Sequence, residues 1–212
     1  EMGHALHSFY TWANQPYIYG GYTIFVAEVA STLNETLLTD YLLKTVEDKK
    51  LKLYVINHYL EQFRGTVYRQ TMFAEFEKII HEKAEAGEPL TPDLLCQVYR
   101  KLNEDYYGPD MIIDREIELE WARIPHFYNA FYVYKYATGF SAATALAKQI
   151  LDQGQPAADR YLDFLKSGSS DYSINLLKKA GVDMTAPEPI QLALGVFEEV
   201  LSQAEQLFAE LE

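Results

Sequence analysis

The feature that most limits the fold of this chain is the spacing of its apolar residues. They recur every three or four positions through nearly the whole sequence, and no segment alternates convincingly with a period of two. Proline and glycine interrupt the pattern at intervals typical of loops between helices. No internal repeat or low-complexity tract is present. The pattern therefore predicts an all-α fold.

The interruptions also set the expected helix boundaries. Thr91-Pro92 is a typical start, because Thr can cap a helix and Pro fits its first turn. Gly181 is a typical end. Helices are expected over residues 1–13, 22–46, 51–86, 91–106, 115–121, 127–151, 156–166, 170–180 and 189–211. No interior linker has the character of a domain boundary, so residues 1–212 are expected to form a single helical domain.

The composition argues against several classes of partner. The net charge is −13, which disfavours binding to nucleic acid phosphates or to an anionic membrane. No apolar run approaches the roughly 18 residues that suggest a membrane span. The one cysteine, Cys96, cannot form an internal disulfide, which fits a reducing compartment. We therefore expect neither nucleic acid nor membrane as a partner.

The first four residues, Glu1-Met2-Gly3-His4, contain a pattern with chemical meaning. On a helix, Glu1 and His4 lie on one face. They match the end of the H-E-x-x-H signature if a histidine stands immediately before Glu1. In that signature two histidines bind zinc and the Glu activates water. This partial motif alone is a weak signal, since Glu1 could be a solvated residue and His4 a buried histidine with hydrogen-bonded ring nitrogens.

Glu28 lies on the next expected helix, in an apolar stretch that includes Val26 and Val29. A buried lone carboxylate is costly, so Glu28 needs either a metal or an ion-pair partner. Glu35 is two turns further along the same face and could orient a metal-bound histidine.

A second group of candidates is aromatic. His126-Phe127-Tyr128 precedes Tyr132 and Tyr136, and the three tyrosines, spaced four apart, would form one stripe along the expected helix over 127–151. Phenol and imidazole donors can stabilise the oxyanion of peptide hydrolysis. A packed aromatic core face explains the same spacing.

Several separated blocks together resemble oligoendopeptidase F, in the thimet-oligopeptidase-like zinc metallopeptidase family. The resemblance covers essentially the whole chain. The blocks are Glu1-Met-Gly-His-Ala-Leu-His-Ser8, Glu28 with Glu35, Arg69-Gln-Thr-Met-Phe-Ala-Glu-Phe76, Ile124-Pro-His-Phe-Tyr128, Phe131-Tyr-Val-Tyr-Lys-Tyr-Ala-Thr-Gly139 and Gly168-Ser-Ser-Asp-Tyr172.

The resemblance implies a cytoplasmic zinc metalloendopeptidase that cleaves short peptides. Its two largely helical lobes enclose a deep channel, and this chain would be the zincin-like C-terminal half. Carried over residue by residue, Glu1 is the general base, and His4 and Glu28 are two of three protein ligands to Zn2+. His7 is an alternative ligand or a neighbour that supports the ligands. His126 matches the family's histidine.

Which of Tyr128, Tyr132 and Tyr136 stabilises the oxyanion stays open at this point. The family's first ligand histidine has no counterpart in this sequence. We therefore expect the chain alone to be inactive, and its partners to be short peptide substrates and the missing N-terminal half of the same protein. The alternative is a non-catalytic helical module that binds peptide or protein through a tyrosine-rich cleft.

The block that begins at Arg69 has two interpretations of its own. Arg69, Glu75 and Glu77 form either a buried polar network that supports the site or a solvated helix face.

Overall fold

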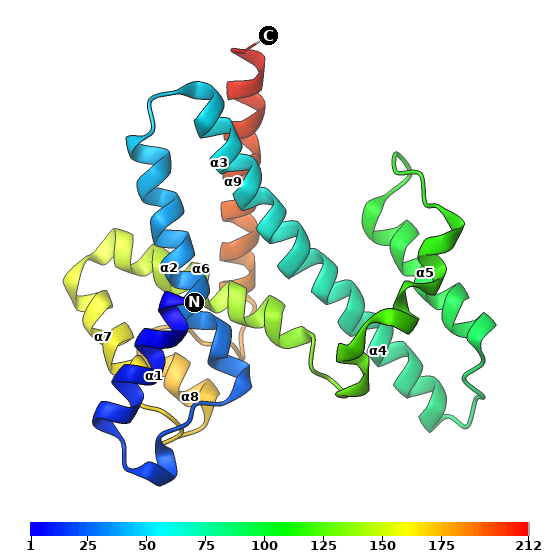
Figure 1. Ribbon diagram of the computed structural model, residues 1–212, viewed down its shortest axis with the longest axis horizontal. Coiled ribbons are helices and arrows are strands. Elements are labelled where there is room, and N and C mark those ends of the chain that lie inside the picture. Colours follow the sequence, from blue (N-terminus) through cyan, green and yellow to red (C-terminus); the bar gives the residue numbers. More distant parts are fainter. Residues whose placement is uncertain (212) are drawn as a thin grey trace. The chain divides into compact units, whose positions relative to one another are not determined.

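The computed structural model describes residues 1–211, and in that range the chain forms helices and no strands (Figure 1). The predicted all-α class is therefore confirmed. The described chain divides into two compact units. Unit 1 comprises residues 1–64 and 138–211, and unit 2 comprises residues 65–137. The single domain expected over 1–212 stays a prediction, and its last residue, Glu212, lies outside the described residues.

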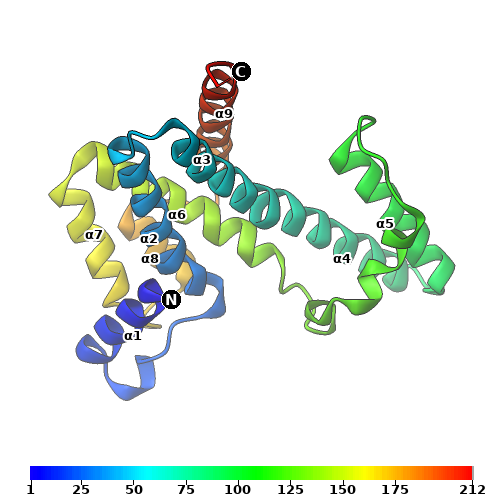
Figure 2. The same ribbon diagram turned by 45° about the horizontal axis from the view of Figure 1, so that its top comes forward.

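Unit 1 is a set of helices that pack in pairs. Helix α1 packs on α2 and on α7, α3 packs on α2 and on α9, and α7 packs on α8. The turned view in Figure 2 shows α1 alongside α2. The elements of the unit are α1 (Met2–Asn14), η1 (Tyr17–Tyr19), α2 (Ile24–Thr45), α3 (Lys49–Phe63), most of α6 (Tyr134–Gln153), α7 (Gln155–Leu165), α8 (Ser173–Ala180) and α9 (Glu188–Ala209).

The core of unit 1 forms where α2, α6 and α7 meet. Small residues of α6 allow close packing, since Ala142, Ala143 and Ala147 are fully buried. They contact larger side chains of α2 and α7, which include Val29, Leu33 and Phe164. The buried side chains of α2 are thus part of the core that holds this unit together.

Unit 2 is built on a second core. Its elements are most of the π-helical turn η2 (Arg64–Tyr68), α4 (Arg69–Glu85), α5 (Pro92–Tyr107), and the 3-10 helices η3 (Arg115–Arg123) and η4 (Pro125–Tyr128). Helix α5 packs on α4 and η3. The core residues are Met72, Phe73, Phe76, Tyr99, Leu102, Ile124 and Val133.

Caps explain several helix boundaries. The Thr91 hydroxyl accepts the Leu94 N–H at 3.3 Å, so the predicted start of α5 is confirmed. The Asp48 carboxylate accepts the Leu51 N–H at 2.8 Å at the start of α3. Gly181 has a φ of 107° and ends α8, as predicted.

Two predicted helices differ from the structure. The helix expected over 51–86 contains the π-helical turn η2, which splits it into α3 and α4. The helix expected over 127–151 begins only at Tyr134, because η4 ends at Tyr128 and Phe131 has a φ of 57°. A left-handed residue interrupts an α-helix. The predicted stripe of Tyr128, Tyr132 and Tyr136 along one helix is therefore wrong, since only Tyr136 lies on α6.

Within residues 1–211, none of the helices combines the length and the apolar character needed to cross a membrane.

Candidate active site

The structure brings together two of the predicted metal ligands, His4 of α1 and Glu28 of α2. The His4 Nε2 atom lies 3.5 Å from the Glu28 Oε2 atom, and their side chains are 31% and 40% exposed. The Ser31 hydroxyl donates to the same Glu28 oxygen at 3.2 Å. The carboxylate is thus oriented from its own helix and remains accessible from outside.

Gly3 explains how α1 comes so close to α2. A Cβ atom at this position would lie 2.3 Å from the carbonyl carbon of Ala30 and 2.3 Å from the nitrogen of Ser31. Only a residue without a side chain lets the two backbones touch there. Since His4 follows Gly3 and Glu28 precedes Ala30 by half a turn, this contact places the two side chains together.

His7 occupies a different environment from His4. Its side chain is buried and its ring stacks on Tyr22, with ring centres 3.7 Å apart and planes 2° from parallel. Burial, and secondly the charge of His4, lower the pKa of His7 to about 4, so its ring is neutral at pH 7. No hydrogen bond of His7 Nδ1 is found within residues 1–211. His7 therefore packs between α1 and its neighbours, and its metal role stays a prediction.

The remaining acidic candidates of unit 1 are on the surface. Glu1 is exposed at the start of α1, where its carbonyl accepts the Ala5 N–H at 3.0 Å. Glu35 is exposed and accepts a hydrogen bond from Gln62 Nε2 at 3.0 Å. The structure thus leaves the Glu1 carboxylate accessible to solvent, and it pairs Glu35 with an amide.

The donor chemistry of the His4–Glu28 pair fits zinc, which binds imidazole nitrogen and carboxylate oxygen. A catalytic zinc site takes three protein ligands and keeps one position open. In the described part of the chain, no group of three or more His, Cys, Asp or Glu side chains is placed to hold an ion. Within residues 1–211, His4 and Glu28 are therefore a pair of side chains of the kind that zinc binds.

Three aromatic candidates meet in unit 2, and we call His126, Tyr132 and Tyr136 the aromatic cluster. The Tyr136 hydroxyl lies 3.3 Å from His126 Nε2. The ring centre of Tyr132 is 5.5 Å from that of His126 and 5.8 Å from that of Tyr136. Tyr128 takes no part in these ring contacts, and its side chain is 86% exposed. Tyr132 and Tyr136 are therefore close together although they do not share one helix, and Tyr128 lies apart from them.

Glu77 is a buried acid that contacts the chain between His126 and Tyr136, and no catalytic role was predicted for it. It is 1% exposed, and its Oε1 accepts the Phe131 N–H at 2.9 Å. Burial raises the pKa of Glu77, and the N–H groups of Phe131 and Val133 oppose this. Its spacing offered a signal, because Glu77 follows Phe73 and Phe76 on the apolar face of α4.

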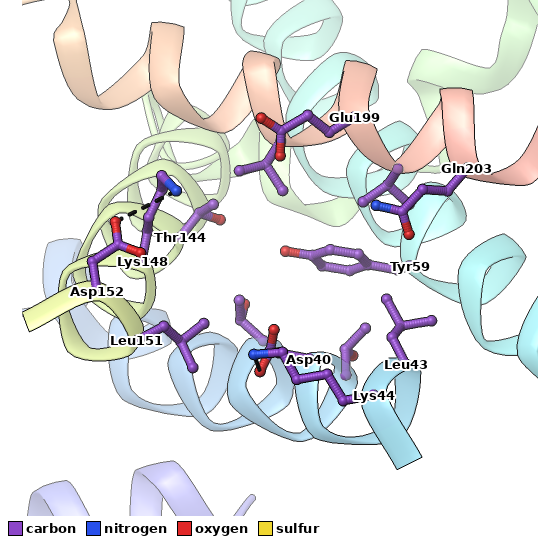
Figure 3. Close-up of a pocket in the computed structure, with 14 residues that line it drawn as sticks. Asp40, Leu43, Lys44, Tyr59, Thr144, Lys148, Leu151, Asp152, Glu199 and Gln203 are labelled. Carbon is purple, nitrogen blue, oxygen red and sulfur yellow. Dashed lines mark hydrogen bonds and ion pairs between the residues drawn. The ribbon is translucent and has the colours of Figure 1, made fainter. Parts of the chain in front are cut away.

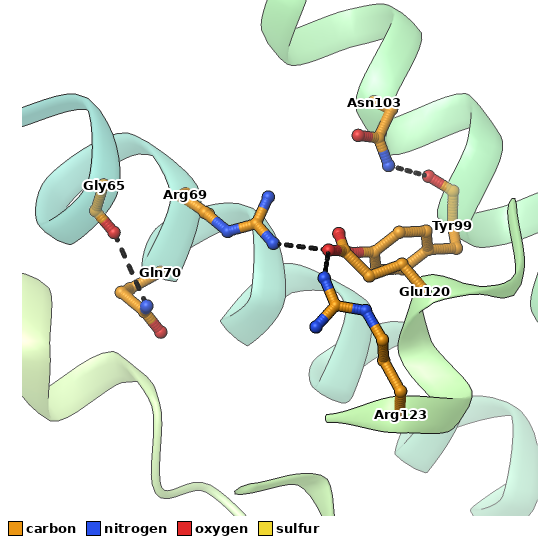
Figure 4. Close-up of polar contacts among 7 residues, drawn as sticks. All are labelled: Gly65, Arg69, Gln70, Tyr99, Asn103, Glu120 and Arg123. Atoms are coloured by element: carbon orange, nitrogen blue, oxygen red, sulfur yellow. Dashed lines mark hydrogen bonds and ion pairs between the residues drawn. The ribbon is translucent and has the colours of Figure 1, made fainter. Parts of the chain in front are cut away.

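Arg69 belongs to a network with other members than predicted (Figure 4). Its Nη2 donates to Glu120 Oε1 at 2.7 Å, and the Tyr99 hydroxyl donates to Glu120 Oε2 at 2.6 Å. Arg123 pairs with the same carboxylate. Burial raises the pKa of Glu120, but Tyr99 and Arg69 outweigh it and the pKa lies below its usual value. A single network of Arg69, Glu75 and Glu77 is therefore wrong.

Unit 1 also contains a pocket of about 280 Å³ between α2, α3, α6 and α9 (Figure 3). Lys44 pairs with Asp40 and Lys148 with Asp152 at its rim. The Tyr59 hydroxyl is buried in it, and no hydrogen bond of good geometry to that hydroxyl is found within the described residues. None of the predicted site residues lines this pocket.

Comparisons with known proteins agree with these observations. The model of peptidase family M3 matches residues 1–196. The chain is 65% identical to oligopeptidase PepF of Bacillus subtilis (strain 168) over 207 residues, which are 98% of this chain and 31% of PepF. It is 51% identical to group B oligopeptidase PepB of Streptococcus agalactiae serotype III (strain NEM316), over 99% of this chain and 35% of PepB.

A solved structure shows the same fold. The crystal structure of oligoendopeptidase-F from Enterococcus faecium aligns with a TM-score of 0.89 at 51% identity, covering 99% of this chain and 38% of that one. The chain belongs to peptidase family M3. It spans about a third of the length of the relatives that it matches.

Proposed function

We propose that the protein to which these residues belong is a zinc-dependent metalloendopeptidase that hydrolyses internal bonds of short peptides. The observation that carries the proposal is the 3.5 Å approach of His4 Nε2 to Glu28 Oε2, in a chain of family M3. A histidine and an acid on two packed helices, both partly exposed, would supply two of the three protein ligands that a catalytic zinc site uses.

His4 and Glu28 would hold the zinc ion. When bound, zinc would polarise the carbonyl of the scissile bond and make water a better nucleophile. Glu1 would take a proton from the attacking water and pass one to the leaving amine.

The aromatic cluster would stabilise the oxyanion. His126 and Tyr136 already form one polar pair, and Tyr132 adds a second phenol beside them. Donors fixed in advance stabilise the developing charge without reorganising. Their assignment to this reaction rests on the resemblance to oligoendopeptidase F. Tyr128 remains a candidate for binding the substrate, since its ring is exposed.

His7 would support the site without binding the metal. Its ring is buried against Tyr22 and Phe164, so a bound ion at His7 would require this packing to open. A neutral stacked ring fixes α1 against its neighbours, and His4 lies one turn away on that helix.

The substrates would be short unfolded peptides that enter a channel between two lobes. The rest of the longer protein would be the main partner of this chain. A cytoplasmic location is part of the proposal and rests on the resemblance alone. We expect the 212-residue chain to be inactive by itself, because a site with two protein ligands holds zinc more weakly than one with three.

The test compares this chain with the extended protein, by which we mean a chain of the relatives' length that contains these residues. Zinc content is measured by mass spectrometry, and hydrolysis with an internally quenched peptide. We expect the extended protein to bind one zinc and cleave the peptide, and His4→Ala to lose both. The chain alone should do neither. An extended protein that binds no metal and cleaves nothing would contradict the proposal and favour the helical binding module.

A further inference from the structure

Phe131 has an unusual backbone conformation. With a φ of 57°, it is the one non-glycine residue in the described chain with a positive φ. Phenylalanine rarely adopts the left-handed region, so the surroundings must hold it there. The residue lies between η4, which carries His126, and α6, which carries Tyr136.

The contact that holds this backbone comes from α4. The buried carboxylate of Glu77 accepts the Phe131 N–H at 2.9 Å. A buried carboxylate is costly, and a neutral apolar side chain would fill the same space among the core residues of unit 2 without that cost. The acid is therefore best explained by the backbone N–H group that it binds.

The same helix also holds the Phe131 side chain. His81 lies one turn after Glu77, and its ring centre is 4.5 Å from that of Phe131. The His81 ring is itself fixed, since its Nδ1 lies 2.7 Å from the Glu77 carbonyl oxygen. Glu77 and His81 thus contact Phe131 at its backbone and at its ring.

We propose that Glu77 is a positioning residue, which fixes the turn at Phe131 and thereby sets Tyr132 against His126 and Tyr136. The proposal rests on the proposed function, because it assumes that the aromatic cluster acts in hydrolysis. Tyr132 directly follows Phe131, and Val133 after it is fully buried in the core of unit 2. A rotation at Phe131 would therefore displace Tyr132 more than any other member of the cluster.

The experiment uses the extended protein with Glu77→Leu, which removes the acceptor, and Glu77→Gln, which keeps an oxygen acceptor without the charge. The matched control is Glu82→Gln on the same helix, where an exposed Glu pairs with Lys78. Amide hydrogen exchange of the segment 128–133 is followed by mass spectrometry. Peptide hydrolysis gives kcat and KM separately.

For Glu77→Leu we expect exchange in this segment to be about tenfold faster or more, because a hydrogen-bonded amide becomes free. We expect kcat to fall by about tenfold to a hundredfold with little change in KM, since a misplaced catalytic group affects the transition state more than binding. Glu77→Gln should recover most of both values, and Glu82→Gln should match the unchanged protein. A purely structural role for Glu77 would not give this rescue together with the kcat effect.

If Glu77→Leu does not fold, Glu77→Ala removes the same acceptor with a smaller side chain and should also speed exchange at this segment. Unchanged exchange in the variant that folds would overturn the proposal. Faster exchange with unchanged kcat would overturn the catalytic part of it. If the unaltered extended protein cleaves no peptide, the proposed function fails, and the exchange data still decide whether Glu77 holds the turn.

Discussion

His4 Nε2 and Glu28 Oε2 lie 3.5 Å apart, although they belong to different helices. Both side chains are partly exposed, and exposed pairs contribute little to stability. The arrangement is therefore better suited to binding than to holding the fold together.

Replacing Glu28 should weaken zinc binding in the extended protein. Glu28→Gln keeps the shape of the side chain and removes the charge that a divalent cation needs. We expect zinc affinity to fall by about a hundredfold or more, because even residues behind the ligands contribute tenfold to a hundredfold. Competition with a chelating dye measures the affinity. Glu47→Gln, an exposed acid after the end of α2, is the control. Equal affinity in the two variants would show that Glu28 is not a ligand.

Gly3→Ala should destabilise the protein although alanine favours helix. The gain in helix propensity is about 1 kcal/mol. The added Cβ would lie 2.3 Å from the carbonyl of Ala30, where backbone atoms cannot move aside cheaply. We expect a net loss of about 2 kcal/mol or more in the free energy of unfolding, measured by urea titration. Met2→Ala is the neighbouring control, since Met2 is 69% exposed. A neutral Gly3→Ala would disprove the close contact.

The stability that Glu120 provides should depend on pH. Its pKa in the folded protein lies below the usual value, so its contribution is complete above the unfolded pKa of about 4.3. The contribution is lost as pH falls through the folded pKa. Glu120→Gln leaves Arg69 and Arg123 without a carboxylate, and we expect a loss of about 2–3 kcal/mol at pH 7. Urea titrations at pH 7, 5 and 3 measure the difference, which should shrink toward pH 3. A constant difference would contradict the assignment.

Two buried tyrosines should respond oppositely to loss of the hydroxyl. Tyr99 donates to Glu120 at 2.6 Å, so Tyr99→Phe leaves a carboxylate oxygen without its donor and should cost about 1–3 kcal/mol. The hydroxyl of Tyr59 is buried without a hydrogen bond of good geometry among the described residues. Tyr59→Phe should therefore be neutral or stabilising by up to about 1 kcal/mol. Thermal unfolding of both variants provides the comparison, and a large loss for Tyr59→Phe would show that Thr36 or Thr144 bonds the hydroxyl.

Much of the fold could be predicted from the sequence because it depends on local signals. Apolar spacing, the Thr91 cap and Gly181 gave the helices and several of their ends. The π-helical turn at Arg64–Tyr68 and the turn at Phe131 were missed. Neither position carries a proline, and the aromatic residues around Phe131 happen to keep a helical spacing. At Phe131 the backbone depends on a tertiary contact, because the Glu77 carboxylate accepts its N–H.

In the candidate site, too, local signals could be predicted from the sequence and tertiary contacts could not. That Glu28 and His4 would meet was predictable only through the resemblance to oligoendopeptidase F, and the close contact at Gly3 gives the physical reason. Glu77 binds the Phe131 N–H and Glu120 binds Arg69, and the members of each pair are far apart in the sequence. Residue spacing cannot predict such pairs. The buried position of Glu77 on an apolar helix face was the one usable signal.

The division of the chain into units also bears on the order of events during synthesis. Unit 2 is one continuous segment, residues 65–137, and can fold as soon as it leaves the ribosome. Unit 1 is interrupted by it, and α1 is anchored late, because the Thr11 hydroxyl donates to the carbonyl of Leu165. The contact of α1 with α7 therefore forms only after Leu165 has been translated, whereas its contact with α2 can form earlier. A pause in translation between residues 64 and 138 would leave Val29 and Leu33 of α2 without the side chains of α6 and α7 that share their core.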